Sequence, residues 1–365
     1  MELVHRCSDT GLQVMLIRGL GSERDCAEGE VLEAGLPLAL SHRAVWAAHV
    51  GRWEPVFMLV HDEAGRACGG FAIEEVRTRA MPGHVILRVG RFGGNLSDEV
   101  CRVALQAMIK LAKSSPRVLR IQVNVFSRDR RVAIGNLLEE LGFREIQPPS
   151  SYRNTLVIDL RPTEDEIFAS LGKSARKRIR QTAKMSLQSV AISDPVYAER
   201  LKELQQAAFK RTGGHIISED WRGILKMSHD HPNLSRVIGS FPSEVTAPSN
   251  MAAFGWVCNH GDHAEYRSAG STKQSGQVPF GSLVLWEMIR WAKSTGAQWF
   301  DMGGVTLGEG DDSALEGISQ FKMYFSHEVV EVGAEWVFEP APVRARIGDF
   351  VSNSASRIRT WIKRG

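Results

Sequence analysis

The alternation of apolar and polar positions in the first 160 residues is typical of an α/β domain. Apolar residues at every second position predict strands, and apolar residues at intervals of three and four predict helices. The stretch "DEAGRACGG" separates two alternating runs and predicts a β-hairpin. The elements predicted here are a hairpin at 55–76, strands at 84–92, 117–125 and 152–160, a helix at 98–115, and a helix within 130–147 that ends at Gly142 before a strand from Phe143.

The second half of the chain repeats this order of elements, which indicates an internal structural repeat. Thr163 followed by Glu166 forms a capping box at the start of its first helix. The elements predicted here are helices at 161–171, 172–185, 198–214, 221–231 and 279–296, and strands at 234–241, 251–260, 263–271, 297–304, 317–325 and 329–340.

These elements predict three parts. Residues 1–158 form a first domain, residues 159–330 form a second domain that includes the basic helix 172–185, and residues 331–365 add a strand and a basic amphipathic helix. The apolar residues of that last helix, Ile347, Phe350, Val351, Ile358 and Trp361, are expected to pack, and the segment is expected to return to the first domain.

Length and composition limit the class of protein. The chain of 365 residues is about twice the usual domain size, and 43% apolar and 24% charged residues are ordinary for a globular protein. The five cysteines form no CxxC pair, so neither a disulfide framework nor a metal site is predicted. The N-terminus lacks a signal-peptide pattern, and no apolar run reaches the roughly 18 residues of a membrane span. We therefore expect a reduced, cytoplasmic protein that is not stably inserted in a membrane.

A net charge of +3 does not indicate a nucleic-acid partner, but the positive charge is concentrated locally. The stretch "KSARKRIRQTAK" has no acidic residue. Its cations repel one another unless an anion is present, so phosphates of tRNA or the pyrophosphate of a nucleotide-linked precursor would fit them. The alternative is a solvated basic face. The candidate polyanion-binding residues are Lys173, Arg176, Lys177, Arg180 and Lys184, with Arg178 between them.

Residues 317–325, "GISQFKMYF", place a lysine among aromatic residues. The alternation predicts a strand on which Phe321, Met323 and Phe325 point to one side and Lys322 and Tyr324 to the other. Because burying an ammonium is costly, a lysine held on such a rigid element indicates a functional position. The alternative is an edge-strand lysine whose ammonium reaches water.

Four segments occur in an order that resembles the Fem family: "LGKSARKRIRQTAKM", "FKRTGGH", "AEYRSAGS", and "WEMIRWAKSTGAQWFDMGG" followed by "GISQFKMYF". Fem proteins are transferases that move an amino acid from aminoacyl-tRNA to the peptide of a peptidoglycan precursor. The resemblance is best over about residues 160–330 and is closest to the FemX-like type without a coiled-coil arm. It implies an α/β fold of two tandem GNAT-like domains, with mixed sheets flanked by helices.

The resemblance also implies roles for particular residues. Phe321 and Lys322 correspond to a Phe-Lys pair that lines the aminoacyl-tRNA channel, and we expect both to be catalytic. Arg211 is expected to contact phosphates of the precursor, and Tyr266 to line the substrate-binding cleft. His215 stands where the family has an aromatic residue.

Two further substrate-binding residues are expected. Tyr324 shares the side of Lys322 on the predicted strand. Asp301 ends a strand beside two glycines, where it either faces the cleft or caps the amides of Gly303 and Thr306.

The expected reaction is transfer of an aminoacyl group from aminoacyl-tRNA to an amine of a nucleotide- or lipid-linked cell-wall precursor, without a cofactor. A CoA-dependent N-acyltransferase acting on an amino sugar or peptide of the cell envelope is the alternative. The stretch "KQSGQVPFGS" at 273–282 lacks the R/Q-x-x-G-x-G/A loop of CoA-dependent GNAT domains. No Ser/His/Asp or Cys/His grouping indicates a covalent acyl-enzyme. A non-catalytic binding module is a third hypothesis.

Overall fold

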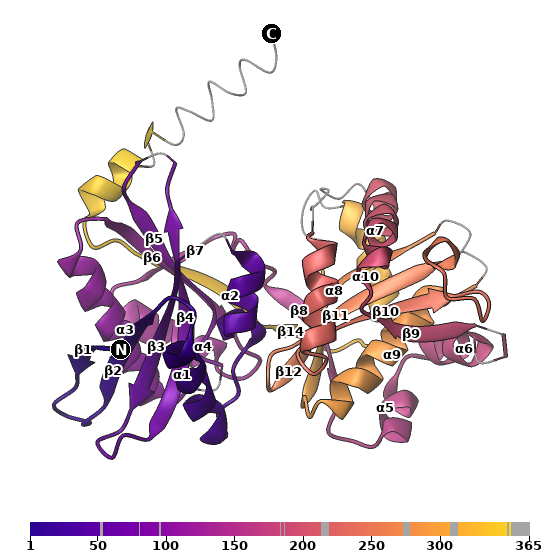
Figure 1. The fold of residues 1–365 in the computed structure, drawn as a ribbon, viewed down its shortest axis with the longest axis horizontal. Coiled ribbons are helices and arrows are strands. Elements are labelled where there is room, and N and C mark those ends of the chain that lie inside the picture. The colour runs from indigo at the N-terminus through magenta and orange to yellow at the C-terminus, as the bar shows by residue number, and fades with distance from the viewer. Residues whose placement is uncertain are drawn as a thin grey trace, which may run out of the picture. The chain divides into compact units, whose positions relative to one another are not determined.

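The computed structural model describes residues 1–51, 54–79, 81–94, 96–182, 184–185, 187–212, 219–272, 278–306, 313–348 and 350–351. The chain divides into two compact units, each built around one mixed sheet covered by helices (Figure 1). Unit 1 comprises Met1–Arg153 and Val332–Gly365, and unit 2 comprises Asn154–Glu331. Within the described ranges, no helix has the length and apolarity needed to cross a bilayer.

Unit 1 has the strand order β1-β2-β3-β4-β5-β6-β15-β7. Alternation along β3 assigns its two faces, because Val56 and Met58 join the core packed against α3, whereas Phe57 packs with α1 on the opposite face. The elements are β1 (Glu2–Arg6), β2 (Gln13–Arg18), α1 (Ser22–Glu33), η1 (Leu40–His42), α2 (Ala44–Val50), β3 (Glu54–His61), β4 (Ala67–Arg77), β5 (Val85–Phe92), α3 (Asp98–Ser114), β6 (Val118–Phe126), α4 (Arg131–Glu140), β7 (Arg144–Ile146) and β15 (Gly333–Phe338).

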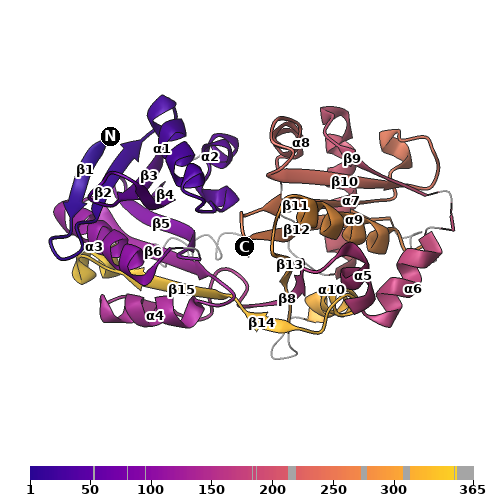
Figure 2. The ribbon, with the colours of Figure 1, turned by 90° about the horizontal axis from the view of Figure 1, so that it is seen from below.

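Unit 2 has the strand order β14-β8-β13-β12-β11-β10-β9. All residues of β11 are buried because helices cover both faces: Phe254 packs on Trp221 of α8, and Gly255 lies against Met288 of α9 (Figure 2). The elements are β8 (Asn154–Asp159), α5 (Glu164–Ser170), α6 (Lys173–Thr182), β9 (Gln188–Ile192), η2 (Pro195–Tyr197), α7 (Ala198–Thr212), α8 (Trp221–Asp230), β10 (Ser235–Phe241), η3 (Pro248–Asn250), β11 (Ala253–Asn259), β12 (His263–Ser271), α9 (Phe280–Ser294), β13 (Trp299–Gly304), α10 (Ser313–Met323) and β14 (Val329–Glu331).

The two sheets have corresponding strand orders. The order β9-β10-β11-β12-β13-β8-β14 in unit 2 matches β2-β3-β4-β5-β6-β15-β7 in unit 1, and in each the parallel pair is joined by a helix, α9 or α3. The next-to-last strand of each sheet is contributed by the other repeat. β8 follows β7 of unit 1 in sequence but pairs in the sheet of unit 2, and β15 follows β14 of unit 2 but pairs in the sheet of unit 1. The repeats therefore exchange strands.

This exchange corrects the expected domain boundaries. The strand predicted at 152–160 was assigned to a first domain ending at residue 158, but β8 pairs with β13 and β14 and so belongs to unit 2. The strand predicted at 329–340 is two strands, with β14 in the second sheet and β15 in the first. The apolar pattern identified these strands, but their partners are set by tertiary pairing.

The strand predicted over 317–325 is wrong, because Lys322 lies in the last turn of the helix α10. The alternation in "FKMYF" covers only five residues, whereas Ile318, Phe321 and Phe325 recur at helical spacing. The buried residues of this segment, Ser319, Lys322 and Phe325, share the same spacing.

The C-terminal helix packs on unit 1, but through other residues than those expected. Residues 342–348 and 350–351 are helical, and the helix packs on unit 1 through small residues: Ala345 is fully buried, and a Cβ at Gly348 would lie 3.1 Å from Met81 Sδ. Ile347, Phe350 and Val351, which were expected to pack, are exposed. Ile358 and Trp361 lie outside the described residues.

Candidate active site

The parallel strands of unit 2 separate early along their length. β12 pairs with β13 only from His263 to Glu265, opposite Trp299 to Asp301, although both strands continue. A register shift against β11 leaves Arg267 as an extra residue at this point, and such a bulge bends the strand that contains it. In unit 1 the corresponding pair, β5 and β6, is also interrupted by register shifts, but it pairs again at Phe92 and Val125, near the ends of both strands. The separated strand ends are therefore a feature of unit 2.

The side chain of Lys322 contacts both separating strands. Its Nζ donates a hydrogen bond of 2.7 Å to the carbonyl oxygen of Gly304 at the end of β13, and lies 5.6 Å from the ring centroid of Tyr266 on β12. Ser319, one turn earlier in α10, accepts a 3.1 Å hydrogen bond from the amide of Thr306. The Ser319–Lys322 face of α10 thus holds the chain that leaves β13.

Asp301 is fully buried beside this lysine and fixes the end of β13. Its Oδ1 accepts hydrogen bonds from Thr155 Oγ1 (2.5 Å) and from the amide of Gly303 (2.8 Å). Gly303 has φ +73°, and a Cβ there would lie 3.0 Å from the Tyr266 carbonyl oxygen and 3.3 Å from Lys322 Nζ. Glycine is therefore required for both conformation and space. Of the two amides predicted to be capped, Asp301 caps that of Gly303, while that of Thr306 bonds to Ser319.

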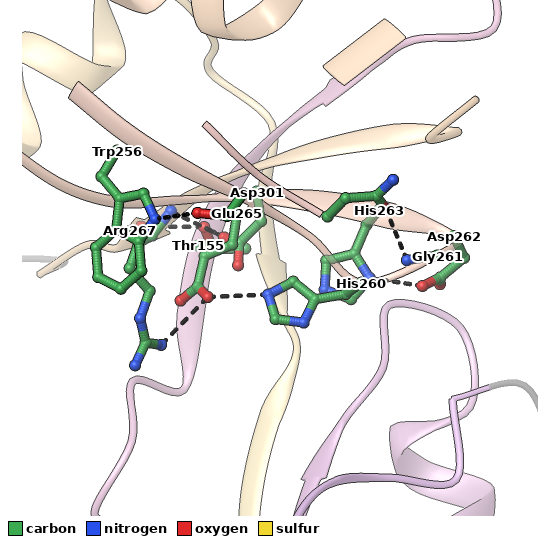
Figure 3. A network of polar contacts seen from close by, with 12 residues as sticks. Thr155, Trp256, His260, Gly261, Asp262, His263, Glu265, Arg267 and Asp301 are labelled. Carbon is green, nitrogen blue, oxygen red and sulfur yellow. Dashed lines mark hydrogen bonds and ion pairs between the residues drawn. The ribbon is translucent and has the colours of Figure 1, made fainter. Parts of the chain in front are cut away.

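A second buried carboxylate lies across the parallel pair from Asp301. Glu265 is 4% exposed and stands opposite Asp301 in the β12–β13 register. Its carboxylate lies between the His260 ring, 3.1 Å away, and the guanidinium of Arg267, 3.3 Å away (Figure 3). The His260 ring stacks on the His263 ring, with 4.9 Å between their centroids, and the His263 ring stacks on Trp299, with 4.4 Å between theirs. This arrangement holds the Glu265 carboxylate in place.

Burial and charge act on Lys322 in opposite directions. Removal from water lowers the pKa of Lys322 from 10.5 to about 8, and the carboxylates of Asp301 and Glu265 oppose this shift. Burial raises the pKa of the Tyr266 phenol, so this ring remains neutral. Lys322 makes one hydrogen bond with the described part of the chain, which leaves N–H groups available to a ligand.

The two aromatic neighbours of Lys322 point elsewhere. Phe321 packs against the start of α9, where a Cβ at Gly281 would lie 3.7 Å from its ring. The Tyr324 ring lies under the guanidinium of Arg178, with 4.6 Å between the guanidinium carbon and the ring centroid. The predicted common face of Lys322 and Tyr324 is therefore wrong, because the helix replaces the strand on which it depended.

Tyr324 instead joins α10 to the basic helix α6. A Cβ at Gly172, just before α6, would lie 2.3 Å from the Tyr324 carbonyl oxygen, so only glycine fits there without displacing the backbone. We expect Gly172→Ala to lower the free energy of unfolding by about 1–3 kcal/mol, measured by chemical denaturation.

A matched control is Gly29→Ala in α1, where an added Cβ would have no neighbour within 4 Å. It should stabilise the protein by about 0.5–1 kcal/mol because alanine favours helix. Equal effects from the two substitutions would contradict the close approach of α6 to Tyr324.

The helix α6 ends at Thr182, so Lys184 lies in the turn beyond it rather than in the predicted helix 172–185. Lys173, Lys177, Arg180 and Lys184 are exposed, and Arg176 donates a 2.6 Å hydrogen bond to the Ala169 carbonyl. Within the described ranges, none of the candidate cations of this segment forms an ion pair with a carboxylate.

The remaining predicted residues lie around α7. Arg211 is exposed near the end of this helix and donates to the carbonyl oxygen (2.8 Å) and the hydroxyl (3.3 Å) of Ser271, at the end of β12. His215 lies outside the described residues. The structure thus brings Lys322, Asp301 and Tyr266 together, and ties Arg211 to the strand that contains Tyr266.

Sequence reasoning missed Thr155, Glu265, His260 and Arg267. A signal was present in "NHGDHAEYR", which contains six ionisable residues within nine positions, including Tyr266. Which of them face Lys322 depends on the bulge and on the parallel register, and neither is visible in one sequence.

The repeated order of strands, with a helix joining each parallel pair, defines a protein of two tandem GNAT-like domains. A crystal structure of FemX superposes with a TM-score of 0.73 at 14% identity, covering 90% of this chain and 99% of that chain. The C-terminal domain of a putative lysylphosphatidylglycerol synthetase from Agrobacterium fabrum gives a TM-score of 0.50 at 11% identity, covering 88% of this chain and 94% of that one. These likenesses confirm the predicted fold class.

Residues 244–352 match the FemAB family, a segment that includes Tyr266, Asp301 and Lys322. The match covers less than a third of the chain, and together with the FemX-like fold it supports the resemblance to the Fem family and a transferase. The resemblance predicted from sequence is thereby confirmed. No curated protein sequence matches the chain.

Proposed function

We propose that this protein moves an aminoacyl group from aminoacyl-tRNA to an amine of a peptidoglycan precursor peptide, forming an amide bond. The observation that carries the proposal is the Lys322 ammonium, 5% exposed and held at the separating ends of β12 and β13 within the segment that matches the FemAB family. The reaction would take place in the cytoplasm, where charged tRNA is available.

The chemistry needs a fixed cation. The acceptor amine attacks the ester carbonyl, the new C–N bond forms, and negative charge develops on the carbonyl oxygen. The C–O bond to the ribose then breaks, and the proton lost by the amine is balanced by the one that the ribose oxygen gains. One N–H group of Lys322 donates to the Gly304 carbonyl, and the remaining N–H groups would donate to these oxygens. A preorganised donor stabilises such charge more than water does.

The position of α6 favours a polyanionic donor. Its exposed cations lack carboxylate partners within the described ranges, and its Arg178 lies on Tyr324, two residues after Lys322. Phosphates bound along α6 would therefore approach the end of α10 that contains the reactive lysine. A long basic face fits the backbone of a nucleic acid, whose binding should weaken steeply with salt. Phe321, beside α9, would line the same approach.

Arg211 supports a charged acceptor. Two of its N–H groups donate to Ser271, which fixes the guanidinium at the end of β12, and the residue remains exposed. A guanidinium fixed in this way would suit the phosphates of a nucleotide- or lipid-linked precursor. Tyr266, earlier on the same strand, would lie between this group and Lys322.

The test supplies labelled amino acid on tRNA, or labelled acetyl-CoA, with a UDP-linked muramyl pentapeptide as acceptor. We expect label to pass to the pentapeptide from tRNA, and prior RNase treatment to abolish the transfer. Transfer from acetyl-CoA alone would contradict the proposal and establish a CoA-dependent acyltransferase. Binding of tRNA without transfer from either donor would favour a binding module.

A further inference from the structure

The C-terminal helix of unit 1 exposes an apolar stripe. Val343, Ile347, Phe350 and Val351 are 73%, 53%, 73% and 39% exposed, and their spacing of four, three and one residues places them on one side of a helix. Four of the twelve exposed large apolar side chains among the described residues fall within these nine positions. The others are spread along the chain, so the stripe is a local feature.

The opposite side of this helix is fixed to unit 1. Ala345 is fully buried, Gly348 lies against Met81 and Leu119, and Arg344 donates a hydrogen bond to the carbonyl oxygen of Pro116. The yellow helix of Figure 1 lies on unit 1, and its small residues Ala345 and Gly348 face that unit. An apolar stripe left exposed on an anchored helix points to a partner outside the chain.

The charge of the same segment selects the partner. Arg346 is exposed, and residues 342–365 contain six Lys or Arg (Arg344, Arg346, Arg357, Arg359, Lys363, Arg364) against Asp349. A second copy would bring like charges together, and RNA would pair with the cations but leave the apolar side chains in water. A bilayer with anionic headgroups satisfies both, since it takes up apolar side chains at its interface and attracts cations beside them.

We propose that the stripe formed by Val343, Ile347, Phe350 and Val351 docks the protein on the surface of a bilayer that contains anionic lipid. The helix lies in the interface and does not span it. The inference does not depend on the proposed function, because it rests on the C-terminal helix and uses no residue of the candidate active site.

The test is co-sedimentation of the full chain with vesicles of phosphatidylcholine alone or mixed with phosphatidylglycerol. We expect binding to the mixed vesicles and little to the neutral ones, weakening as salt is raised. The double variant Ile347→Ser/Phe350→Ser should bind on the order of tenfold more weakly, and the single variant Val343→Ser should also be weaker. Both should retain the wild-type melting temperature.

The matched control is Val132→Ser/Val196→Ser, which removes two apolar side chains of similar exposure, 62% and 60%, on α4 and η2. It should bind vesicles as the wild type does. Absence of binding to the mixed vesicles, or equal binding by the stripe variants, would overturn the proposal. A dimer in sedimentation velocity that is lost in the stripe variants would also overturn the proposal. Loss of tRNA binding in the stripe variants but not in the control would overturn it as well.

Transfer to a soluble, UDP-linked acceptor should be unchanged in the stripe variants. If transfer from tRNA fails in the wild type while vesicle binding holds, the proposed function fails and the docking surface stands.

Discussion

Replacing Lys322 by methionine is expected to lower kcat for aminoacyl transfer by about 10²–10³-fold, with a much smaller effect on acceptor binding. The ammonium is the group placed to donate to the oxygen on which charge develops, and removing one such donor typically has a cost of this size. Methionine keeps the length and apolar volume of the side chain. The measurement is single-turnover transfer of label from charged tRNA to the UDP-linked pentapeptide.

The same substitution should not destabilise the protein at pH 7. The lowered pKa of Lys322, about 8 instead of 10.5, means that holding the charged form in the fold costs on the order of 3 kcal/mol. Methionine removes that cost but leaves the Gly304 carbonyl without its donor, at about 1–3 kcal/mol. We therefore expect a free energy of unfolding equal to the wild type or higher by about 1 kcal/mol. Activity is then lost without a loss of stability, as expected for a functional lysine.

Lys293→Met is the matched control. Lys293 is a partly buried lysine of unit 2 that donates to the backbone carbonyls of Leu160 and Pro162, and its charge acts on the Glu166 carboxylate. Its loss should lower stability and leave kcat within about twofold of the wild type. An unchanged rate in Lys322→Met, or an equal loss in Lys293→Met, would remove Lys322 from the mechanism.

The sequence predicted much of the fold because many elements have a clear period. The helix with apolar residues at Val100, Val103 and Met108, and the capping box of Thr163 and Glu166, occur as expected. What one sequence could not provide was the pairing of strands. β8 and β15 are ordinary apolar strands, and nothing in their composition indicates that each completes the sheet of the other repeat.

The site was predicted in parts rather than as a whole. Lys322 and Asp301 were identified from local patterns and Tyr266 from the family resemblance, and the structure brings them together through α10, β13 and β12. Glu265 was missed because its role depends on lying opposite Asp301 in a parallel register. The strand predicted for Lys322 was wrong, yet the lysine stays a candidate, since a helix also holds it rigidly.

The charge state of Lys322 leads to a second large effect, on the pH dependence of transfer. If the ammonium stabilises the developing oxyanion, kcat should fall as pH rises through about 8, because the charged form is lost there rather than near 10.5. If neutral Lys322 served as a base, kcat would rise through the same range. A pH–rate profile under single-turnover conditions separates the two, and a rise would contradict the proposed role.

Asp301→Asn sharpens this test. Asparagine keeps an oxygen to accept from Thr155 and from the Gly303 amide, so the end of β13 should stay in place, but it removes the negative charge that acts most on Lys322. The pKa of Lys322 should then fall further, and the falling limb should move to lower pH by about one unit, with a roughly fivefold loss of kcat near pH 8. Glu265→Gln should move it in the same direction by less.

Asp262→Asn is the control, because the Asp262 carboxylate pairs with His263 and does not act on Lys322. Its falling limb should stay near pH 8. If the falling limb of the pH–rate profile does not move in Asp301→Asn, while Lys322→Met remains inactive, the limb reflects the titration of a group other than Lys322. A limb that moves to lower pH in Asp301→Asn and stays in Asp262→Asn ties the charge needed for transfer to Lys322, through the buried carboxylate beside it.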